Sequence, residues 1–210
     1  MTAGTLRIFG DRGSGNCLKV LWVAAHLRLP YEWIDVDVTA DRSEARRTRQ
    51  ADFLAMNPFG EIPVLQLPDG RTLAQSNAIL RFLAHGSALL PADAFGQAKV
   101  DEWLFWEQYS HEPYIAVCRF HMRYAGRRAD ERDAWRVERG EAALDLLDRT
   151  LGRREWLADD SFSIADVALL AYTRLAGEGG FDLEPRPHLR RWIARCEAVL
   201  GLNPFQAAAA

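Results

Sequence analysis

The most informative stretch of this chain is Asn57-Pro58-Phe59-Gly60-Glu61-Ile62-Pro63-Val64-Leu65, followed after a short turn by Gln75-Ser76-Asn77. Pro63 opens a predicted strand, has no N–H for a ladder and pushes Ile62 into an extended conformation. The backbone of Ile62 can therefore pair with something other than a neighbouring strand. Ser76 lies where a helix should begin, so its hydroxyl, the N–H groups of the first turn and the helix dipole all favour an anion. An extended partner beside a carboxylate site is what a small acidic peptide requires.

The sequence around this stretch alternates between strand and helix patterns. Apolar alternation predicts strands, and apolar residues at helical spacing predict helices. Pro68-Asp69-Gly70 separates two of the strands and is a strong hairpin turn. The predicted strands cover residues 5–9, 31–38, 64–67 and 72–74, and the predicted helices cover 17–29, 43–56 and 77–84. The order βαβ-αββα predicts an α/β domain of the thioredoxin-like class.

After residue 84 the pattern changes to long helices without a convincing strand. Residues 85–96 contain Gly86 and Pro91 and are interpreted as a linker. Helical patterns follow over residues 98–123, 130–151, 164–175 and 186–200. We therefore expect a thioredoxin-like domain at 1–84, a linker at 85–96 and an all-α domain at 97–210.

Composition limits the classes of function. A hydrophobic content of 49% with 26% charged residues is that of a globular protein, and the net charge of −3 gives no electrostatic reason to expect nucleic acid or an anionic membrane. No apolar run approaches the ~20 residues that span a bilayer. The three cysteines, Cys17, Cys118 and Cys196, are too widely spaced for a disulfide framework or a metal site. We expect a cytoplasmic protein without metal, nucleic acid or membrane partner.

The loop Ser14-Gly15-Asn16-Cys17 lies between the first predicted strand and helix, where thioredoxin-like proteins carry Cys-x-x-Cys. Because the first position is Ser14, a dithiol cycle is excluded. A serine hydroxyl at a helix N-terminus can instead donate a hydrogen bond to a ligand thiolate and lower the pKa of that thiol. Two simpler interpretations stay open: Ser14 can be a helix cap, and Cys17 fits a small buried residue better than a reactive thiol.

Other motifs also have a structural and a functional interpretation. Ser76 can cap its helix and bind an anion with the same groups. Ser163-Ile164-Ala165-Asp166 is a capping-box variant and is interpreted as structural. The stretch with Trp106, Tyr109 and Pro113 fits either a core or an apolar ligand pocket, and Pro113 should kink or break its helix.

With these residues in view, the chain resembles the cytosolic glutathione S-transferases over nearly its whole length. The motifs that carry the resemblance are Ser14-Gly15-Asn16-Cys17-x-Lys19-Val20, Asn57-Pro58-x-Gly60-x-Ile62-Pro63-Val64-Leu65, Gln75-Ser76-Asn77-Ala78-Ile79 and Ser163-Ile164-Ala165-Asp166-Val167. The resemblance implies a glutathione-binding domain, a helical domain that supplies the pocket for a hydrophobic electrophile, and a homodimer. It is similar to the bacterial, theta- or zeta-like serine branch, because Phe9 stands near the position where other branches carry a tyrosine.

The resemblance also implies roles for individual residues. Ser14 would stabilise the glutathione thiolate, with Asn16 as an auxiliary donor. Ile62, held by Pro63, would pair with the cysteinyl backbone, and Gln75 and Ser76 would take the γ-glutamyl carboxylate and amine. The electrophile pocket would include Trp106, Tyr109 and Pro113.

Two positions depart from the pattern of many relatives. Glu61 replaces a neutral or basic residue, and Gln75 replaces the commoner Glu. Arginines between Arg42 and Arg49 could supply the missing positive charge for the glycyl carboxylate. Phe59 is a candidate contact for the dimer.

The predicted function is a glutathione transferase that activates the thiol for conjugation to an electrophile or for peroxide reduction. Three alternatives use the same sequence features. The chain could be a non-catalytic interaction protein of the same fold, a thiol transferase that works through Cys17, or a zeta-like isomerase. Non-catalytic proteins of this fold typically lack the hydroxyl loop or the Gln/Glu-Ser pair, and both are intact here. A test of binding to immobilised glutathione would distinguish the transferase from the interaction protein.

Overall fold

The computed structural model describes residues 4–38 and 47–204 of the chain. The chain forms two compact units, Met1–Ser87 and Ala88–Ala210. The predicted division at residue 84 stays a prediction, and the helix α4 (Ala94–Trp106) already begins inside the predicted linker. No helix in the described ranges is long and apolar enough to cross a membrane.

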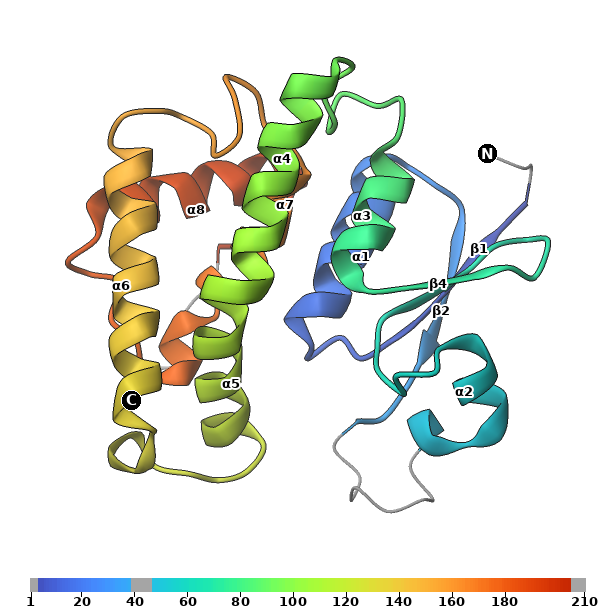
Figure 1. Cartoon of the computed structure of the whole chain (residues 1–210), viewed down its shortest axis with the longest axis horizontal. Helices are drawn as coiled ribbons and strands as arrows, with labels where there is room; N and C mark the ends of the chain where they lie inside the picture. The colour runs from blue at the N-terminus through green and yellow to red at the C-terminus, as the bar shows by residue number, and fades with distance from the viewer. Residues whose placement is uncertain (1–3, 39–46, 205–210) are drawn as a thin grey trace. The chain divides into compact units, whose positions relative to one another are not determined.

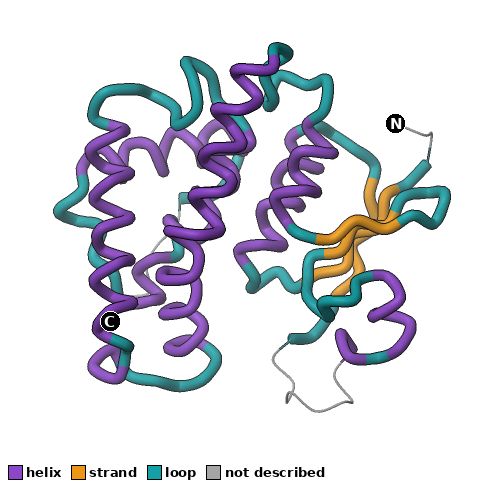
Figure 2. The backbone as a smooth tube through the Cα atoms, viewed as in Figure 1, coloured by secondary structure: helices purple, strands orange, loops and turns teal. Residues whose placement is uncertain are grey.

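The first unit has the predicted thioredoxin-like order of elements. The sheet order is β2-β1-β3-β4, in which β2 is parallel to β1 and β3 is antiparallel to both β1 and β4. Figure 2 shows these strands together in one twisted sheet. In chain order the elements are β1 (Leu6–Gly10), α1 (Gly15–His26), β2 (Tyr31–Asp35), a 3-10 turn (Arg47–Arg49), α2 (Ala51–Met56), β3 (Val64–Gln66), β4 (Thr72–Ala74) and α3 (Ser76–Ala84).

Helices cover both faces of this sheet. Helices α1 and α3 lie side by side on one face, and α2 lies beyond the other (Figure 1). On the α2 side, Phe9, Val64 and Phe53 form one buried cluster, in which the rings of Phe9 and Phe53 meet edge to face at 6.5 Å. On the other side Val20 and Ile79 are fully buried. The helices are thus held by apolar side chains that alternate along the strands.

Several boundaries differ from the predicted ones. The strand β2 ends at Asp35, because Val36 still donates to the Gly10 carbonyl at 2.8 Å but no ladder partner follows. The predicted helix 43–56 falls partly outside the described residues. From Arg47 onward it is a 3-10 turn and then the short helix α2. Such ends are set by local hydrogen bonds that apolar spacing does not reveal.

The second unit is all-helical in its described part, as predicted. Every residue of α7 (Ile164–Thr173) is buried, which makes it the central helix of this unit. It packs against α4, α5 (Glu112–Arg123) and α8 (Pro187–Leu200). The helix α6 (Ala134–Leu151) packs against α5 and α8, and the unit also contains 3-10 turns at Ala129–Glu131 and Ala176–Gly179.

The predicted break at Pro113 is present. The helical pattern over 98–123 divides into α4, a π-helical segment at Glu107–His111 and α5, with Pro113 in the first turn of α5. A proline has no N–H for the preceding turn, so the hydrogen-bond pattern there shifts to the wider π spacing.

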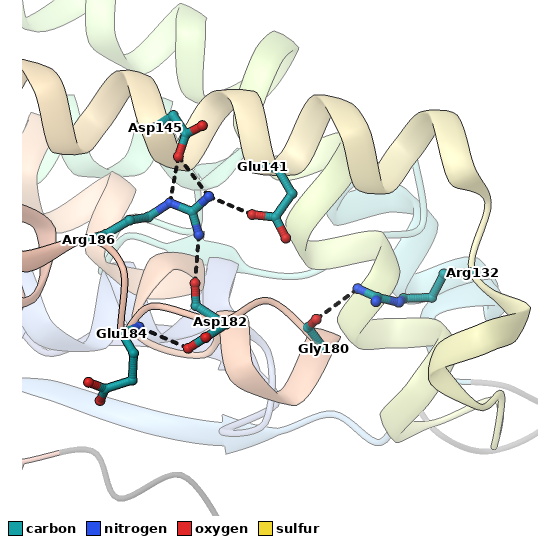
Figure 3. A network of polar contacts seen from close by, with 7 residues as sticks. All are labelled: Arg132, Glu141, Asp145, Gly180, Asp182, Glu184 and Arg186. Carbon is teal, nitrogen blue, oxygen red and sulfur yellow. Dashed lines mark hydrogen bonds and ion pairs between the residues drawn. The ribbon is translucent and has the colours of Figure 1, made fainter.

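A polar network fixes the loop that precedes α8. Figure 3 shows Arg186 between α6 and this loop, and its guanidinium donates to Asp145 at 2.8 Å, to Glu141 at 2.6 Å and to the carbonyl of Asp182 at 2.6 Å. Arg132 donates to the carbonyl of Gly180 at 3.0 Å. Because Arg186 is only 8% exposed, these partners offset the cost of its burial. The network belongs to the packing of the helical unit.

The predicted capping box at the start of α7 is also present. Ser163 accepts from the N–H of Ala165 at 3.2 Å, and Asp166 accepts from the N–H of Ser163 at 3.1 Å. The other Asp166 oxygen accepts from Leu157 N–H and Trp192 Nε1–H at 3.0 and 2.8 Å. Burial raises the pKa of this carboxyl to about 6, against the lowering effect of its donors.

Candidate functional site

The topology of the first unit brings three predicted segments to one edge of the sheet. Gly10 at the end of β1 lies next to the start of β3, because Phe9 pairs with Val64 in the antiparallel register. Val64 also pairs with Ala74, so β4 ends at the same edge. The loop with Ser14, the segment Ile62-Pro63 and the start of α3 are therefore neighbours.

Ser14 is the residue immediately before α1. Its extended backbone (φ −85°, ψ 122°) places its carbonyl at 3.0 Å from the N–H of Leu18, so it begins the helix. Its side chain, however, makes no capping hydrogen bond to the helix. Asp11 holds the loop in place by accepting from the N–H groups of Gly13 and Ser14, at 2.7 and 3.0 Å. Ser14 is half-buried at the positive end of α1, and its hydroxyl caps no backbone N–H of the helix but makes a hydrogen bond to the Cys17 thiol.

Cys17 is not a reactive thiol in this structure. It is fully buried, and burial raises the pKa of its thiol to about 12, although hydrogen bonds from the Asp11 backbone and the Ser14 side chain lower it. A thiol with such a pKa carries almost no thiolate at neutral pH. The geometry therefore supports the simpler interpretation of Cys17 as a core residue.

The Ile62-Pro63 peptide bond is cis, and Pro63 is buried. Ile62 lies before β3, outside the register of that strand with β1. The preceding loop is held by Asn57, which is 1% exposed, donates to the Glu61 carbonyl at 2.8 Å and accepts from the N–H of Phe59 at 3.1 Å. The sequence interpretation did not assign this role to Asn57. The Asn57-Pro58 pair could have indicated this role, because Asn side chains in turns often form hydrogen bonds to nearby backbone groups.

Gln75 adopts a left-handed backbone conformation, with φ +69°. Such a conformation is uncommon for a residue other than glycine and tends to occur at functional sites. Gln75 is exposed, whereas Ser76 beside it is only 5% exposed. The Ser76 hydroxyl lies 3.2 Å from Oδ1 of Asn16. The structure thus brings together two predicted site residues, Asn16 and Ser76, from different helices.

Lys19 is a further polar residue at this place that the sequence interpretation left without a role. It is fully buried in α1, and its Nζ donates to Oδ1 of Asn16 at 2.8 Å. A signal was available in the sequence. Lys19 lies four residues before Val23, on the apolar stripe of its helix, where a charged residue needs a specific partner.

The three predicted pocket residues lie within one short stretch of the helical unit. The ring of Trp106 meets that of Trp103 edge to face at 5.5 Å, and the tilted ring of His111 lies 6.0 Å from it. Tyr109 is 82% exposed, and Pro113 is half-buried. Their assignment to an electrophile pocket stays a prediction. In the described ranges no group of three or more His, Cys, Asp or Glu residues could hold a metal ion.

Comparison with known proteins gives one consistent family. A family model described as the N-terminal domain of glutathione S-transferases matches residues 13–85, and one described as their C-terminal domain matches residues 110–199. Glutathione S-transferase GstB of Escherichia coli strain K12 is 31% identical over 196 residues, which cover 89% of this chain and 90% of that protein.

Two further relatives extend this result. Glutathione S-transferase 3 of Zea mays is 33% identical over 213 residues, covering 96% of this chain and 91% of that protein. The crystal structure of a glutathione S-transferase from Pseudomonas fluorescens Pf-5 superimposes with a TM-score of 0.87 at 45% identity, over 93% of this chain and 96% of that one.

Proposed function

Because the chain belongs to the glutathione S-transferase family, we propose that the hydroxyl of Ser14 activates the thiol of glutathione for attack on an electrophilic carbon or for reduction of a peroxide. Membership of this family identifies the chain as a glutathione transferase with glutathione as its co-substrate. The observation that carries the role of Ser14 is that this serine begins α1 without capping it. A donor at a positive helix end stabilises a thiolate relative to a thiol.

In this mechanism the protein supplies position and electrostatics. Hydrogen bonding from Ser14 and the dipole of α1 lower the pKa of the bound thiol, and the resulting thiolate forms the bond to the electrophile while the leaving group departs. Ile62, beside the cis Pro63, pairs with the cysteinyl backbone. The start of α3, with Gln75 and Ser76, receives the γ-glutamyl group.

Arg49 is the described arginine best placed for the glycyl carboxylate. Gly60 has a φ of +63°, and a Cβ built on it would lie 3.0 Å from Nη1 of Arg49. The guanidinium is therefore next to the loop that carries Glu61. Arg47 is already paired with Asp52 at 2.7 Å, and the arginines at 42 and 46 lie outside the described residues.

The position of Phe9 supports a serine-type, theta- or zeta-like enzyme. Phe9 is 5% exposed and packs on Phe53, so this position supplies neither a hydroxyl nor access to a ligand. Ser14 then remains as the hydroxyl of the β1–α1 loop.

The finer assignments concern the partner molecules. We assign Trp106, Tyr109 and Pro113 to a pocket for a small hydrophobic electrophile. Phe59, which is 60% exposed, is assigned to the contact of a homodimer. A cytoplasmic location agrees with three buried cysteines that form no disulfide.

Of the alternatives, isomerisation of a small keto acid uses the same glutathione site and therefore remains a second candidate. The buried Cys17 does not favour the thiol transferase. Retention on immobilised glutathione, followed by turnover of aryl halides, peroxides, epoxides and keto acids, tests the proposal. A chain that is not retained and turns over none of these substrates would be an interaction protein.

A further inference from the structure

A pocket in the helical unit lies apart from every residue that the proposed function uses. Its volume is about 470 Å³, and it is lined by residues from Arg174, which directly follows α7, to Glu197 in α8. A volume of this order holds a small organic molecule. The apolar part of its wall comes from the loop before α8 and from α8 itself, with Phe181, Leu183, Ile193 and Ala194.

The loop that forms one wall of this pocket is held in place by its own contacts. Arg186 donates to the carbonyl of Asp182 at 2.6 Å, and its ion pairs with Glu141 and Asp145 tie the loop to α6 (Figure 3). Gly177, another lining residue, leaves space open, because a Cβ built on it would meet no described atom within 4 Å. The pocket is therefore formed without any rearrangement of the unit, as most small-molecule sites are.

Most of the charges that line the pocket neutralise one another. Arg174 and Glu197 form an ion pair at 2.8 Å, in which the two side chains are only 12% and 7% exposed. Arg190 and Glu184 form a second pair at 2.7 Å, on the exposed side of the pocket. Neither pair gives the pocket a net charge.

Asp182 is the lining charge that remains. Its carboxylate accepts from the N–H of Glu184 at 2.9 Å, as Figure 3 shows, but it forms no ion pair with any described residue. The pocket thus combines apolar walls with one net negative charge. Such a site attracts a cation with an apolar body and repels an anion of the same shape.

We propose that this pocket binds a small organic cation of the alkyl- or arylamine class. The apolar body of the ligand lies between the loop and α8, and its ammonium group lies beside the carboxylate of Asp182. The site belongs to the helical unit alone and needs no glutathione, so its test is separate from that of the proposed function.

The test uses three probes of similar size that differ in their polar group: phenylbutylammonium, phenylbutanol and phenylbutyrate. Calorimetric titration of the full chain at neutral pH measures the affinity for each. The ammonium should bind about fivefold more tightly than the alcohol, as for one partly exposed charge pair, and the carboxylate should bind most weakly. The affinities should be the same with and without S-hexylglutathione, which competes for the glutathione and electrophile sites.

One substitution tests the charge. Asp182→Asn keeps an acceptor for the N–H of Glu184 but removes the charge, so the ammonium should lose its advantage over the alcohol. Asp159→Asn changes an exposed carboxylate outside the pocket and is the matched control, in which the advantage should persist.

A second substitution tests the cavity. Ala194→Trp fills the pocket from α8 and should weaken the binding of all three probes by about tenfold or more. Ala198→Trp lies one turn further along the same helix, is exposed and lies outside the pocket, so it should leave the affinities unchanged. Gly177→Trp fills the pocket from the 3-10 turn and replaces Ala194→Trp if that variant does not fold. Circular dichroism and thermal unfolding check the fold of each variant.

The possible results lead to different conclusions. Absence of binding by any probe, or a carboxylate that binds as tightly as the ammonium, overturns the proposal. So does an ammonium advantage that survives Asp182→Asn, or binding that survives a folded tryptophan variant. Displacement by S-hexylglutathione would place the probe in the electrophile pocket and would overturn it as well. A chain that binds phenylbutylammonium but not S-hexylglutathione would support this site and contradict the proposed function.

Discussion

Two helices of this protein begin after a serine, and the two serines are used differently. Ser163, before α7, is 3% exposed and accepts from the N–H of Ala165 in its own helix. Ser14, before α1, is half-buried and makes no such bond. The same residue type at the same helical position is therefore structural where its helix uses the hydroxyl. At the start of α1 the hydroxyl of Ser14 caps no backbone N–H and instead makes a hydrogen bond to the Cys17 thiol, and in the proposed site it also serves the ligand.

The first turns of the two helices differ in charge as well. Asp166 in the first turn of α7 neutralises the positive helix end and completes the capping box. The first turn of α1 has no acidic residue, and Cys17 occupies the corresponding position. The positive end of α1 is thus left for an anion, which in the proposed site is the thiolate of glutathione.

The largest effect is expected on catalysis at the first serine. Ser14→Ala should lower kcat/KM for conjugation by roughly 10²–10³, as for the loss of one donor to a developing anion. Because the Ser14 side chain caps no backbone N–H of α1, the midpoint of thermal unfolding of the variant should stay close to that of the wild type. Steady-state kinetics with an aryl halide and calorimetric unfolding measure both. Equal activity of the variant and the wild type would contradict this role of Ser14 and make Asn16 the next candidate for activating the thiol.

The second effect concerns pH and the other helix start. Burial raises the pKa of Asp166 to about 6 from an ordinary value of 3.8. The folded state then binds this proton more tightly than the unfolded chain, so the stabilisation is complete below pH 3.8 and is lost as the pH rises through 6. The change is about 3 kcal/mol. Urea unfolding gives the free energy of unfolding of the wild type and of Asp166→Asn at several pH values between 3.8 and 6. The free energy should fall more steeply with pH in the wild type than in the variant, and an equal dependence on pH in both would contradict the prediction.

A smaller change is expected from Ser163→Ala. Loss of the cap should reduce the free energy of unfolding by about 1–2 kcal/mol. Activity per folded molecule should be unaltered, since this helix start takes no part in the proposed site. Denaturant titration together with kcat provides the check. A selective loss of kcat would mean that the two serines do not differ in the way described.

The smallest effect is expected at Cys17. Cys17→Ala removes a buried sulfur and should destabilise the first unit by about 1 kcal/mol through lost packing. Turnover should change less than about threefold, because a thiol with a pKa near 12 supplies no thiolate. If Cys17→Ala loses turnover of a mixed-disulfide substrate, the result would instead support a thiol transferase that works through Cys17.

Much of the fold followed from the sequence because its signals are local. The hairpin turn at Pro68-Asp69-Gly70, the capping box at Ser163 and the break at Pro113 each depend on a few neighbouring residues. The early end of β2 at Asp35 could not be predicted, because it depends on which strand residues find partners in the sheet.

Part of the candidate site could be proposed from the sequence because it, too, is marked by local signals. The segments around Ser14, Ile62-Pro63 and Ser76 are marked by proline and by helix starts. The contact between Asn16 and Ser76 was not predicted, because their separation of 60 positions is closed only by the packing of α1 against α3. The hydrogen bond from the buried Lys19 to the same Asn16 was not predicted either.

The central claim is that Ser14 stabilises the thiolate of bound glutathione. The most direct measurement is a spectroscopic titration of the thiolate absorbance of glutathione bound to the wild type and to Ser14→Ala. The account predicts a pKa at least about one unit below the usual thiol value of ~8.5 in the wild type, and a return toward that value in the variant. The same pKa in both proteins would contradict it.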